Sequence, residues 1–475
     1  MSTPSRRFPR AACLPLLACI LLLGVAGSLS PTAAQEASLP PLAVSEDDRH
    51  LVYPDGSPFF WLGDTAWELF HRLDRVEART YLDDRAEKGF TVIQAVVLAE
   101  LDGLNTPNPY GETPLVDNDP TRPNEAYFEH VDYVVDQAER RGLYVGMLPT
   151  WGDKFNKKWG VGPEIFTPEN ARAYGEFLGE RYRDDPIVWI LGGDRNPADD
   201  EDRAIIRAMA AGIEAGDDDP LITYHPQGGS QSWQWFHEDA WLDVNMFQSG
   251  HGAFDLPNYR TTREGYRLSP TKPVLDGEPR YEDIPAGFDP NVGWIDAFDV
   301  RQAAYWSVLS GAFGHTYGNN NIWQMWEEGR DPVIHARTPW HEAVDQAGAT
   351  HMGYLRELFL SRPFLDLVPD PSVLAGSTGT GASRQRAARG EAGRYLIAYS
   401  PYGTPLTIEM GTLEDAEATA YWFDPRTGEA EPIGTVEASG TRTFDPPGPQ
   451  GRGRDWVLVV DAASAGFGPP GAPDR

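Results

Sequence analysis

Two short segments decide the fold: Pro186-Ile-Val-Trp-Ile-Leu-Gly-Gly-Asp194 and Lys272-Pro-Val-Leu-Asp-Gly-Glu278. Each is an apolar run bounded by Pro and Gly, a pattern typical of a strand buried in a parallel sheet. Each also places a carboxylate directly after the strand. Because active sites of (β/α)8 barrels lie at the carboxyl ends of the strands, the two segments predict a barrel with two acids at its catalytic rim.

The same strand pattern recurs along the chain and alternates with helical periodicity. The predicted strands are residues 59–63, 91–98, 143–149, 187–192, 221–224, 244–248, 273–275 and 313–317. The clearest predicted helices are residues 76–88, 124–141, 168–183, 200–215, 296–310 and 339–358. Eight strand–helix alternations are the pattern expected of an α/β TIM barrel. A doubly wound open sheet is the alternative, and no Gly-rich phosphate loop follows an early strand to support it.

A second domain is predicted after the barrel. Helical periodicity stops near Pro369, and short strands at 395–399, 406–410, 419–423 and 456–460 then alternate with turns. This pattern of short strands and turns predicts a small antiparallel β-sandwich. The predicted organisation is a signal peptide at 1–34, a linker at 35–44, the catalytic barrel at 45–364, the sandwich at 365–462 and a disordered Gly- and Pro-rich tail at 463–475.

The first 34 residues are typical of a secretory signal. Three arginines precede an apolar stretch at 11–29, and Thr32-Ala-Ala34 offers a cleavage site of small residues. We therefore expect an exported protein, periplasmic or extracellular, without stable membrane association once the signal is removed. A retained membrane anchor is the alternative, because the apolar stretch is about twenty residues long. A lipoprotein anchor at Cys19 is a weaker one, since the apolar run continues past the cysteine.

Composition excludes several classes of function. Both cysteines, Cys13 and Cys19, lie in the signal, so the mature chain has no thiol for a disulfide, a metal site or a nucleophile. The formal net charge of −31 disfavours nucleic acid and anionic membranes as partners. An acidic polysaccharide remains compatible wherever arginines cluster locally. We predict no cofactor and no metal, because the chain lacks a His-x-His after the first strand, a His-Glu-x-x-His motif and a Gly-x-Ser-x-Gly elbow.

Asp194 and Glu278 follow the fourth and seventh predicted strands, which face each other across the rim. Cleavage of a glycosidic bond needs one carboxylic acid to protonate the leaving oxygen and one carboxylate to attack the anomeric carbon. The structural alternative is that both are surface or ion-paired residues, with Arg195 and Arg280 as neighbours. Because two acids stand at corresponding strand ends, we favour the catalytic interpretation.

The other strand ends carry polar and aromatic side chains. Taken singly, each is better explained as a packing or orienting residue, but together they predict the aromatic, polar cup that a carbohydrate requires. The candidate substrate-binding residues are Asp64, Trp67, Trp151, Asp153, Tyr224, His225, Gln248, His251, Arg280, His315 and Tyr317.

Several ordered motifs resemble those of one family. They are Trp61-Leu-Gly-Asp-Thr-Ala-Trp67, Pro149-Thr-Trp-Gly-Asp153, Trp189-Ile-Leu-Gly-Gly-Asp-Arg195, Thr223-Tyr-His-Pro226, Val274-Leu-Asp-Gly-Glu-Pro-Arg-Tyr-Glu282 and Gly314-His-Thr-Tyr-Gly318. Over residues 45–360 the chain resembles the apiosidase-like barrel hydrolases, glycoside hydrolase family 140. The C-terminal region resembles the sandwich domain that follows the barrel in these proteins, labelled collagen-binding in some of them. The resemblance implies retaining hydrolysis of apiose-containing pectin side chains, with Asp194 as acid/base and Glu278 as nucleophile.

Two functions from different classes remain open. The first is a secreted, retaining glycoside hydrolase that acts on plant or algal polysaccharide. The second is a non-catalytic carbohydrate- or matrix-binding protein with a degenerate barrel, in which Asp194 and Glu278 would lie in ion pairs away from any cleft. For the sandwich we expect a buttressing role, since no exposed row of aromatic residues is evident there. The oligomeric state, the sugar and the linkage are not predicted.

Overall fold

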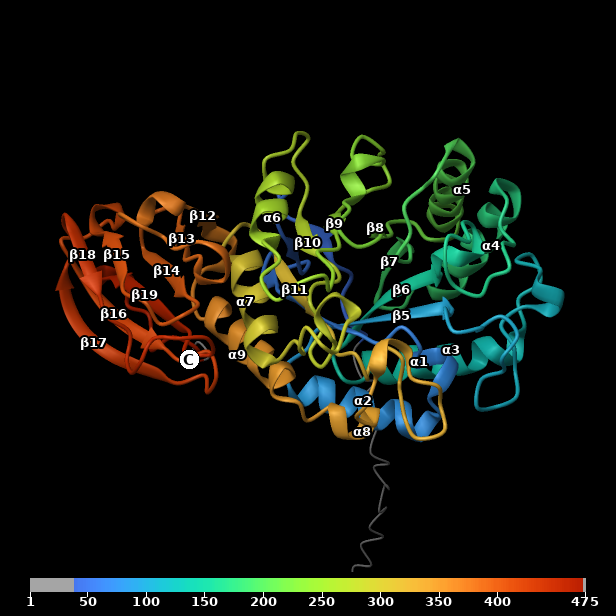
Figure 1. Cartoon of the computed structure of the whole chain (residues 1–475). Coiled ribbons are helices and arrows are strands. Elements are labelled where there is room, and N and C mark those ends of the chain that lie inside the picture. The colour runs from blue at the N-terminus through green and yellow to red at the C-terminus, as the bar shows by residue number, and fades with distance from the viewer. Residues whose placement is uncertain (1–37, 473–475) are drawn as a thin grey trace, which may run out of the picture. The chain divides into compact units, whose positions relative to one another are not determined.

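Figure 1 shows the computed structural model, which describes residues 38–472; the predicted signal at 1–34 lies outside them. Eight parallel strands of the described part surround the barrel axis. They are β4 (Trp61–Thr65), β5 (Val92–Leu98), β6 (Tyr144–Thr150), β7 (Ile187–Gly192), β8 (Ile222–His225), β9 (Asn245–Phe247), β10 (Val274–Asp276) and β11 (Gly314–Tyr317). All eight match predicted strands to within a few residues. The α/β barrel class is thereby confirmed.

Pairing closes these strands into a ring. Six are hydrogen-bonded in the order β11-β4-β5-β6-β7-β8, and β9 pairs with β10. A parallel bridge between Thr223 and Val244 joins β8 to the start of β9. On the other side, the backbone N–H of Phe313 donates to the carbonyl of Val274 at 3.3 Å, which joins β10 to β11. Every residue of β5 is buried, which explains why its sequence is apolar at every position except Gln94.

Helices follow most of the strands. The long ones are α2 (Arg75–Glu87), α3 (Glu125–Glu139), α4 (Pro168–Tyr182), α5 (Asp200–Gly216), α7 (Ala297–Val308) and α9 (Ala347–Leu360). The start of α4 was readable in sequence, because Thr167 caps it and Pro168 occupies its first position. The helix predicted at 339–358 is instead two, α8 (Trp340–Ala343) and α9, separated by extended backbone at Gln346.

Two barrel helices were not predicted, the four-residue α1 (Leu69–Arg72) and the longer α6 (Asn258–Tyr266). Helix α6 has nine residues, and Pro257 before it provides no side-chain cap. Its sequence is polar and buries only four residues, so it lacks the apolar stripe by which helices are recognised. Packing against its neighbours, rather than its own sequence pattern, forms this helix.

The C-terminal domain is antiparallel, as predicted. A six-stranded sheet has the order β12-β13-β14-β19-β16-β17, and β15 pairs with β18. These strands are β12 (Leu367–Pro369), β13 (Arg386–Gly390), β14 (Tyr395–Ser400), β15 (Leu406–Glu409), β16 (Glu417–Phe423), β17 (Ala430–Glu437), β18 (Thr441–Phe444) and β19 (Trp456–Ala462). The four strands predicted from sequence correspond to β14, β15, β16 and β19.

The two faces of the large sheet belong to different cores. In β14, Leu396 and Ala398 pack in the sandwich's own cluster, together with Leu458 and Val460 of β19. The alternate residues of both strands belong to the cluster that contains the barrel core: Tyr395, Ile397, Tyr399, Val457 and Val459. Because side chains alternate along a strand, one sheet serves both cores. This arrangement supports the expected buttressing role.

Two buried ion pairs reinforce the contact between the domains. Arg301 of α7 donates to Asp455 with a closest distance of 2.7 Å, and Arg362 donates to Asp461 at 2.7 Å. The ring of Tyr305 stacks on Tyr399 with centroids 4.7 Å apart. Both carboxylates accept two hydrogen bonds from a planar guanidinium, the strongest common geometry for such a pair.

The predicted ends of the chain need correction. Residues 463–472 are not a disordered tail: Phe467 packs edge-on against Tyr395, and the N–H of Gly471 donates to Ser361 at 3.1 Å. The described part of the predicted linker is also ordered, since β1 (Ala43–Val44) begins a small antiparallel sheet there. The composition of these segments suggested loops, but contacts with the two domains fix them. Among residues 38–472 no helix has the length and apolarity to cross a membrane.

Candidate active site

Asp194 follows β7 through a turn that requires glycine. The φ angles are +98° at Gly192, +83° at Gly193 and +50° at Asp194, so three residues in succession are left-handed. A Cβ on Gly192 would lie 2.5 Å from the carbonyl oxygen of His225, and one on Gly193 would lie 2.9 Å from Cα of Trp151. Asp is among the few residues other than Gly that adopt this conformation. The turn brings the Asp194 side chain to the rim.

Glu278 follows β10, and its carboxylate lies between two histidines. Nε2 of His225 is 3.0 Å from Oε2, and Nε2 of His251 is 3.0 Å from Oε1. Burial alone would raise the pKa of Glu278, but the contacts with the two rings outweigh it and lower the pKa to about 2. Glu278 is therefore a carboxylate at neutral pH, the state in which it can act as a nucleophile.

Asp194 is shifted in the opposite direction. Burial, followed by the negative charge of Glu278, raises the pKa of Asp194 to about 7. A carboxyl group that is still partly protonated near neutral pH can act as a general acid. Two neighbouring carboxyl groups whose pKa values are moved apart form the pattern expected of an acid and a nucleophile in one site.

His225 connects the two acid-bearing segments. Its Nδ1 accepts a hydrogen bond from the backbone N–H of Asp194 at 3.1 Å, so its proton is on Nε2, the atom that faces Glu278. The ring is fully buried, and Trp67 packs edge-on against it with centroids 5.5 Å apart. One rigid ring thus sets the spacing between the end of β7 and the Glu278 carboxylate.

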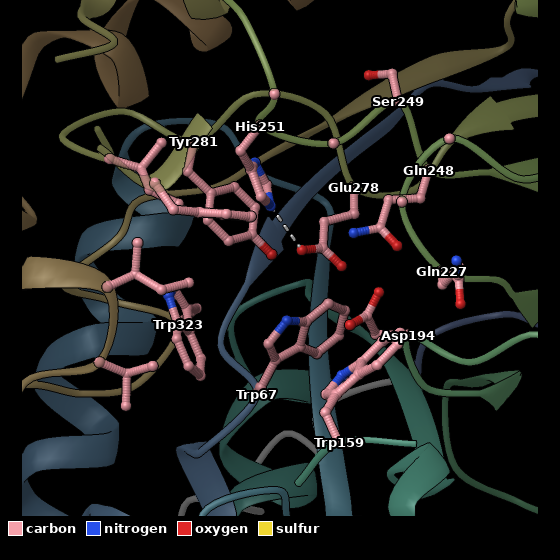
Figure 2. A pocket seen from close by; sticks show the side chains of 18 of the residues that line it. Trp67, Trp159, Asp194, Gln227, Gln248, Ser249, His251, Glu278, Tyr281 and Trp323 are labelled. Atoms are coloured by element: carbon pink, nitrogen blue, oxygen red, sulfur yellow. Dashed lines mark hydrogen bonds and ion pairs between the residues drawn. The ribbon is translucent and has the colours of Figure 1, made fainter. Parts of the chain in front are cut away.

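Both acids line one cavity of about 590 Å³. Figure 2 shows their carboxylates facing the same space, beside the rings of Trp67 and Trp159. Tyr281 and Trp323 form another part of the wall. The volume is within the range of small-molecule sites, and aromatic walls with a few polar groups suit a sugar.

Four of the other predicted substrate-binding residues line this cavity: Trp67, Trp151, Gln248 and His251. His225 lies directly behind its wall, in contact with Glu278. The structural alternative was that Asp194 and Glu278 form ion pairs with their neighbours Arg195 and Arg280. No such pair is found within residues 38–472. Arg195 lies over the ring of Trp159, 3.8 Å from its centroid, and Arg280 donates to Gln302 at 3.0 Å.

Asp64 and Tyr317 face the helix layer instead of the cavity. Asp64 lies 2.8 Å from Nε of Arg85 and accepts a hydrogen bond from Tyr81 at 2.6 Å, and both partners are on α2. Tyr317 donates to Glu282 at 2.6 Å, and Glu282 in turn accepts the N–H of Gly348 on α9 at 3.0 Å. These two side chains therefore hold the ring of helices to the barrel and do not touch a ligand in the cavity.

Asp153 and Tyr224 stabilise the loops that carry the cavity wall. Asp153 pairs with Lys154 at 2.7 Å and accepts the N–H of Gly162 at 2.8 Å, which fixes the loop after β6. Tyr224 donates to the carbonyl of Arg195, directly after Asp194. Neither side chain lines the cavity. Both act on the site through the segments that they hold.

Arg280 and His315 are buried beneath the rim. Arg280 is 1% exposed, and burial lowers its pKa to about 10. His315 is also buried, and burial followed by the charge of Arg280 lowers the pKa of His315 to about 3. His315 is therefore a neutral core residue and not a sugar ligand of this cavity.

The cavity also has polar and aromatic lining residues that were not singled out from the sequence, among them Glu100, Trp159, Gln227, Tyr281 and Trp323. Glu100 is a third carboxyl group in the wall, and burial followed by the charge of Asp194 raises its pKa well above the usual value. Glu100 does stand just after the second strand, where an acid could have been noticed. Trp159 and Trp323 lie on loops without a local signal.

Among residues 38–472, no group of three or more His, Cys, Asp or Glu side chains is arranged to hold a metal ion. The lining of the cavity contains acids, amides, one histidine and aromatic rings, and neither Arg nor Lys.

Comparison with known proteins agrees with this geometry. A family model described as "Apiosidase-like, catalytic domain" matches residues 45–366. The chain belongs to this apiosidase-like family. A second model, described as a collagen-binding domain of a collagenase, matches residues 368–461 of this apiosidase-like chain. A search of curated proteins found no match.

Two solved structures are similar over nearly their whole length. One, described as "Glycoside hydrolase", is 36% identical, with a TM-score of 0.83, and the match covers 90% of this chain and 97% of the other. The other, a glycoside hydrolase family 5 protein from Bacteroides vulgatus, is 35% identical, with a TM-score of 0.83 and coverage of 90% and 96%. The apiosidase-like chain is thus a glycoside hydrolase, and its substrate is a carbohydrate.

Proposed function

We propose that this protein is a secreted, retaining glycoside hydrolase that cleaves a glycosidic bond in plant or algal polysaccharide by double displacement. The observation that carries the proposal is the pair of carboxyl groups in one cavity whose pKa values are shifted in opposite directions. Asp194, with its pKa raised to about 7, is the acid/base, and Glu278, with its pKa lowered to about 2, is the nucleophile.

In the first step Asp194 donates its proton to the glycosidic oxygen while the Glu278 carboxylate attacks the anomeric carbon. The carbon–oxygen bond to the leaving group breaks, and a covalent glycosyl-enzyme forms. His225 and His251 stabilise the charge of Glu278 before the attack. Their rings also hold its two oxygens, so that the carboxylate meets the sugar in one orientation.

In the second step Asp194, now a carboxylate, takes a proton from water. The water oxygen attacks the same carbon, the bond to Glu278 breaks, and the sugar is released with its original configuration. One group must therefore be an acid and then a base. A pKa near the working pH serves both roles.

The substrate is proposed to be an apiose-containing side chain of pectin, and the family description, apiosidase-like, supports the sugar part of this proposal. The aromatic walls provided by Trp67, Trp159 and Trp323 support a sugar ligand. The non-catalytic alternative requires both acids to be paired away from any cleft. Their position in the wall of an open cavity argues against it.

Export is part of this proposal, since polysaccharide is found outside the cell. The sequence at 1–34 supports it, with its arginines and apolar stretch. N-terminal sequencing of the protein recovered outside the cytoplasm should begin close to residue 35. Recovery of the intact leader from the cytoplasm would contradict export.

The test of the reaction is a screen against pectic oligosaccharides and aryl glycosides, with Glu278→Gln as the inactive control. NMR of the first product should show the configuration of the substrate retained. Inversion at the anomeric carbon would exclude the double displacement. Equal turnover by Glu278→Gln would exclude Glu278 as the nucleophile.

A further inference from the structure

A group of arginines surrounds a second hollow, of about 510 Å³, that shares no residue with the active-site cavity. Helix α6 contributes two, a third follows at its C-terminal end, and two come from the segment that enters β13. They are Arg260, Arg263, Arg267, Arg384 and Arg386. Tyr259 and Glu264 complete the lining. Figure 1 labels both α6 and β13.

This concentration of positive charge is unusual for the chain, which has 71 acidic and 40 basic residues. Elsewhere its arginines are mostly paired, as Arg301 and Arg362 are. Within residues 38–472, none of the five forms an ion pair with a carboxylate. The nearby Asp370 is bound by Arg389, at 2.9 Å. The hollow thus contains five cations and a single acid.

Some hydrogen-bonding capacity of these arginines is unused. Nε of Arg384 and Nε of Arg386 are buried without a hydrogen-bond partner in the described structure. The Arg386 guanidinium lies over the ring of Tyr259, 3.7 Å from its centroid, and is held in place there. Burial, followed by the like charge of Arg384, lowers the pKa of Arg386 to about 10. An anion in the hollow would relieve this repulsion by adding a negative charge beside the two guanidinium groups.

We propose that this hollow binds a carboxylate-bearing stretch of an acidic polysaccharide, separately from the catalytic cavity. Arg260, Arg263 and Arg267 have the helical spacing i, i+3 and i+7, which forms a row about 10 Å long on one face of α6. A row of guanidinium groups matches a chain that repeats a carboxylate, because each can bind one in a fork.

The surroundings of the hollow select this polyanion over larger ones. With a net charge of −31, the protein repels a nucleic acid or an anionic membrane wherever contact extends beyond the five arginines. A single polysaccharide strand is narrow enough to bind along the row of arginines without contacting the acidic surface around it. Such a site would keep a glycoside hydrolase on an acidic polymer while the cavity acts on a bond nearby, and it stands even if the proposed reaction is wrong.

The test uses the full mature chain carrying Glu278→Gln, so that the polymer is not degraded. Binding is measured by affinity electrophoresis and calorimetry with polygalacturonate, with neutral galactan as the matched uncharged polymer. We expect polygalacturonate to bind, more weakly at high salt, and galactan to bind at least about tenfold more weakly. No binding of polygalacturonate, or equal binding of galactan, overturns the proposal.

Two triple variants locate the site. Arg260→Gln/Arg263→Gln/Arg267→Gln should weaken polygalacturonate binding at least about tenfold. The control Arg122→Gln/Arg203→Gln/Arg207→Gln removes the same charge from arginines that are already paired with carboxylates, and should change binding less than about twofold. Equal effects of the two variants would mean that total charge, and not this hollow, binds the polymer.

Further variants and ligands test the polymer class and the separation of the two sites. If the triple variant does not fold, polygalacturonate binding is measured instead with Arg267→Glu, which reverses one exposed charge. Tighter binding of a DNA oligonucleotide or of phosphatidylserine vesicles than of polygalacturonate would overturn the polysaccharide assignment.

On the wild-type background, the α6 triple variant should retain the turnover of small aryl glycosides, since its arginines do not line the catalytic cavity. Loss of that turnover would mean that the hollow and the catalytic cavity act as one site, which would contradict the proposal.

Discussion

Buried carboxylates are held in opposite ways in two regions of this molecule. At the interface between barrel and sandwich, Asp455 and Asp461 each accept two hydrogen bonds from an arginine that is permanently charged. At the rim, Glu278 lies between two histidines, and among residues 38–472 neither Glu278 nor Asp194 is paired with an arginine or a lysine. A carboxylate bound by two hydrogen bonds from a permanent cation belongs to a static interface. Carboxyl groups without such a partner can change protonation, which catalysis by acid and base requires.

The largest expected effect is on activity at the rim. Glu278→Gln should lower kcat at least about 10³-fold, because the amide cannot form the glycosyl-enzyme. Steady-state kinetics on any hydrolysed aryl glycoside measures the loss, and circular dichroism checks that the variant is folded at the assay temperature. A folded variant with more than a tenth of the wild-type rate would contradict the role of Glu278.

The largest effect at the interface should be on stability. Asp455→Asn leaves Arg301 buried without a counter-charge, and the free energy of unfolding should fall by about 3–5 kcal/mol. Turnover by the protein that remains folded should not change. Denaturant titration measures the loss, with Asp445→Asn as the control, since Asp445 is an exposed acid of the same domain. A loss no greater than that of the control would show that the interface does not depend on this pair.

A smaller effect should come from the histidines that hold Glu278. The wild-type pH profile should fall above about pH 7, where Asp194 loses its proton. His225→Phe and His251→Phe each remove one contact, so that burial raises the pKa of Glu278 and the acid limb of kcat/KM moves to higher pH. Only His225→Phe should also lower kcat, by about tenfold, because its ring positions Asp194.

The two variants test different roles of similar rings. His225 would be a positioning residue for both acids, whereas His251 contacts Glu278 alone. Acid limbs that stay at the wild-type pH in both variants would show that these rings do not set the ionisation of Glu278. Equal loss of kcat in both would remove the bridging role of His225.

The smallest effect should be a gain of stability. The folded protein raises the pKa of Asp194, so this group stabilises the fold below its unfolded pKa of about 4, and that contribution is lost as the pH rises through about 7. Asp194→Asn removes the penalty, and its unfolding midpoint at pH 8 should exceed that of wild type by about 2 °C. At pH 4 the two midpoints should agree. A lower midpoint for the variant at pH 8 would mean that Asp194 is not destabilised by its surroundings.

Much of the barrel could be predicted from sequence because its strands are buried on both faces. Such strands appear as short apolar runs wherever they occur, and the acids after β7 and β10 could be placed on the rim by counting them. The sandwich strands were recognised in part, since β14 and β19 are apolar on both faces. That property also reflects the double burial between two cores.

The composition of the cavity could not be predicted in full, because it depends on contacts between distant segments. Asp64 stands at a strand end like a ligand, yet its side chain meets Arg85 on α2 instead. Trp159 lies on a loop, and both its ring and its carbonyl contact Arg195, which follows Asp194. Tertiary packing sets which face a strand-end side chain occupies and where a loop folds back. Local sequence patterns do not record this packing.

The most direct measurement of the central claim is the mass of Asp194→Ala, intact and after proteolytic digestion, during hydrolysis of an aryl glycoside that the wild type accepts. A good leaving group departs without an acid, but the glycosyl-enzyme then lacks its base and accumulates. We predict a mass increase of one glycosyl group on the peptide that contains Glu278. A label on another residue, or product release without any labelled protein, would contradict the account.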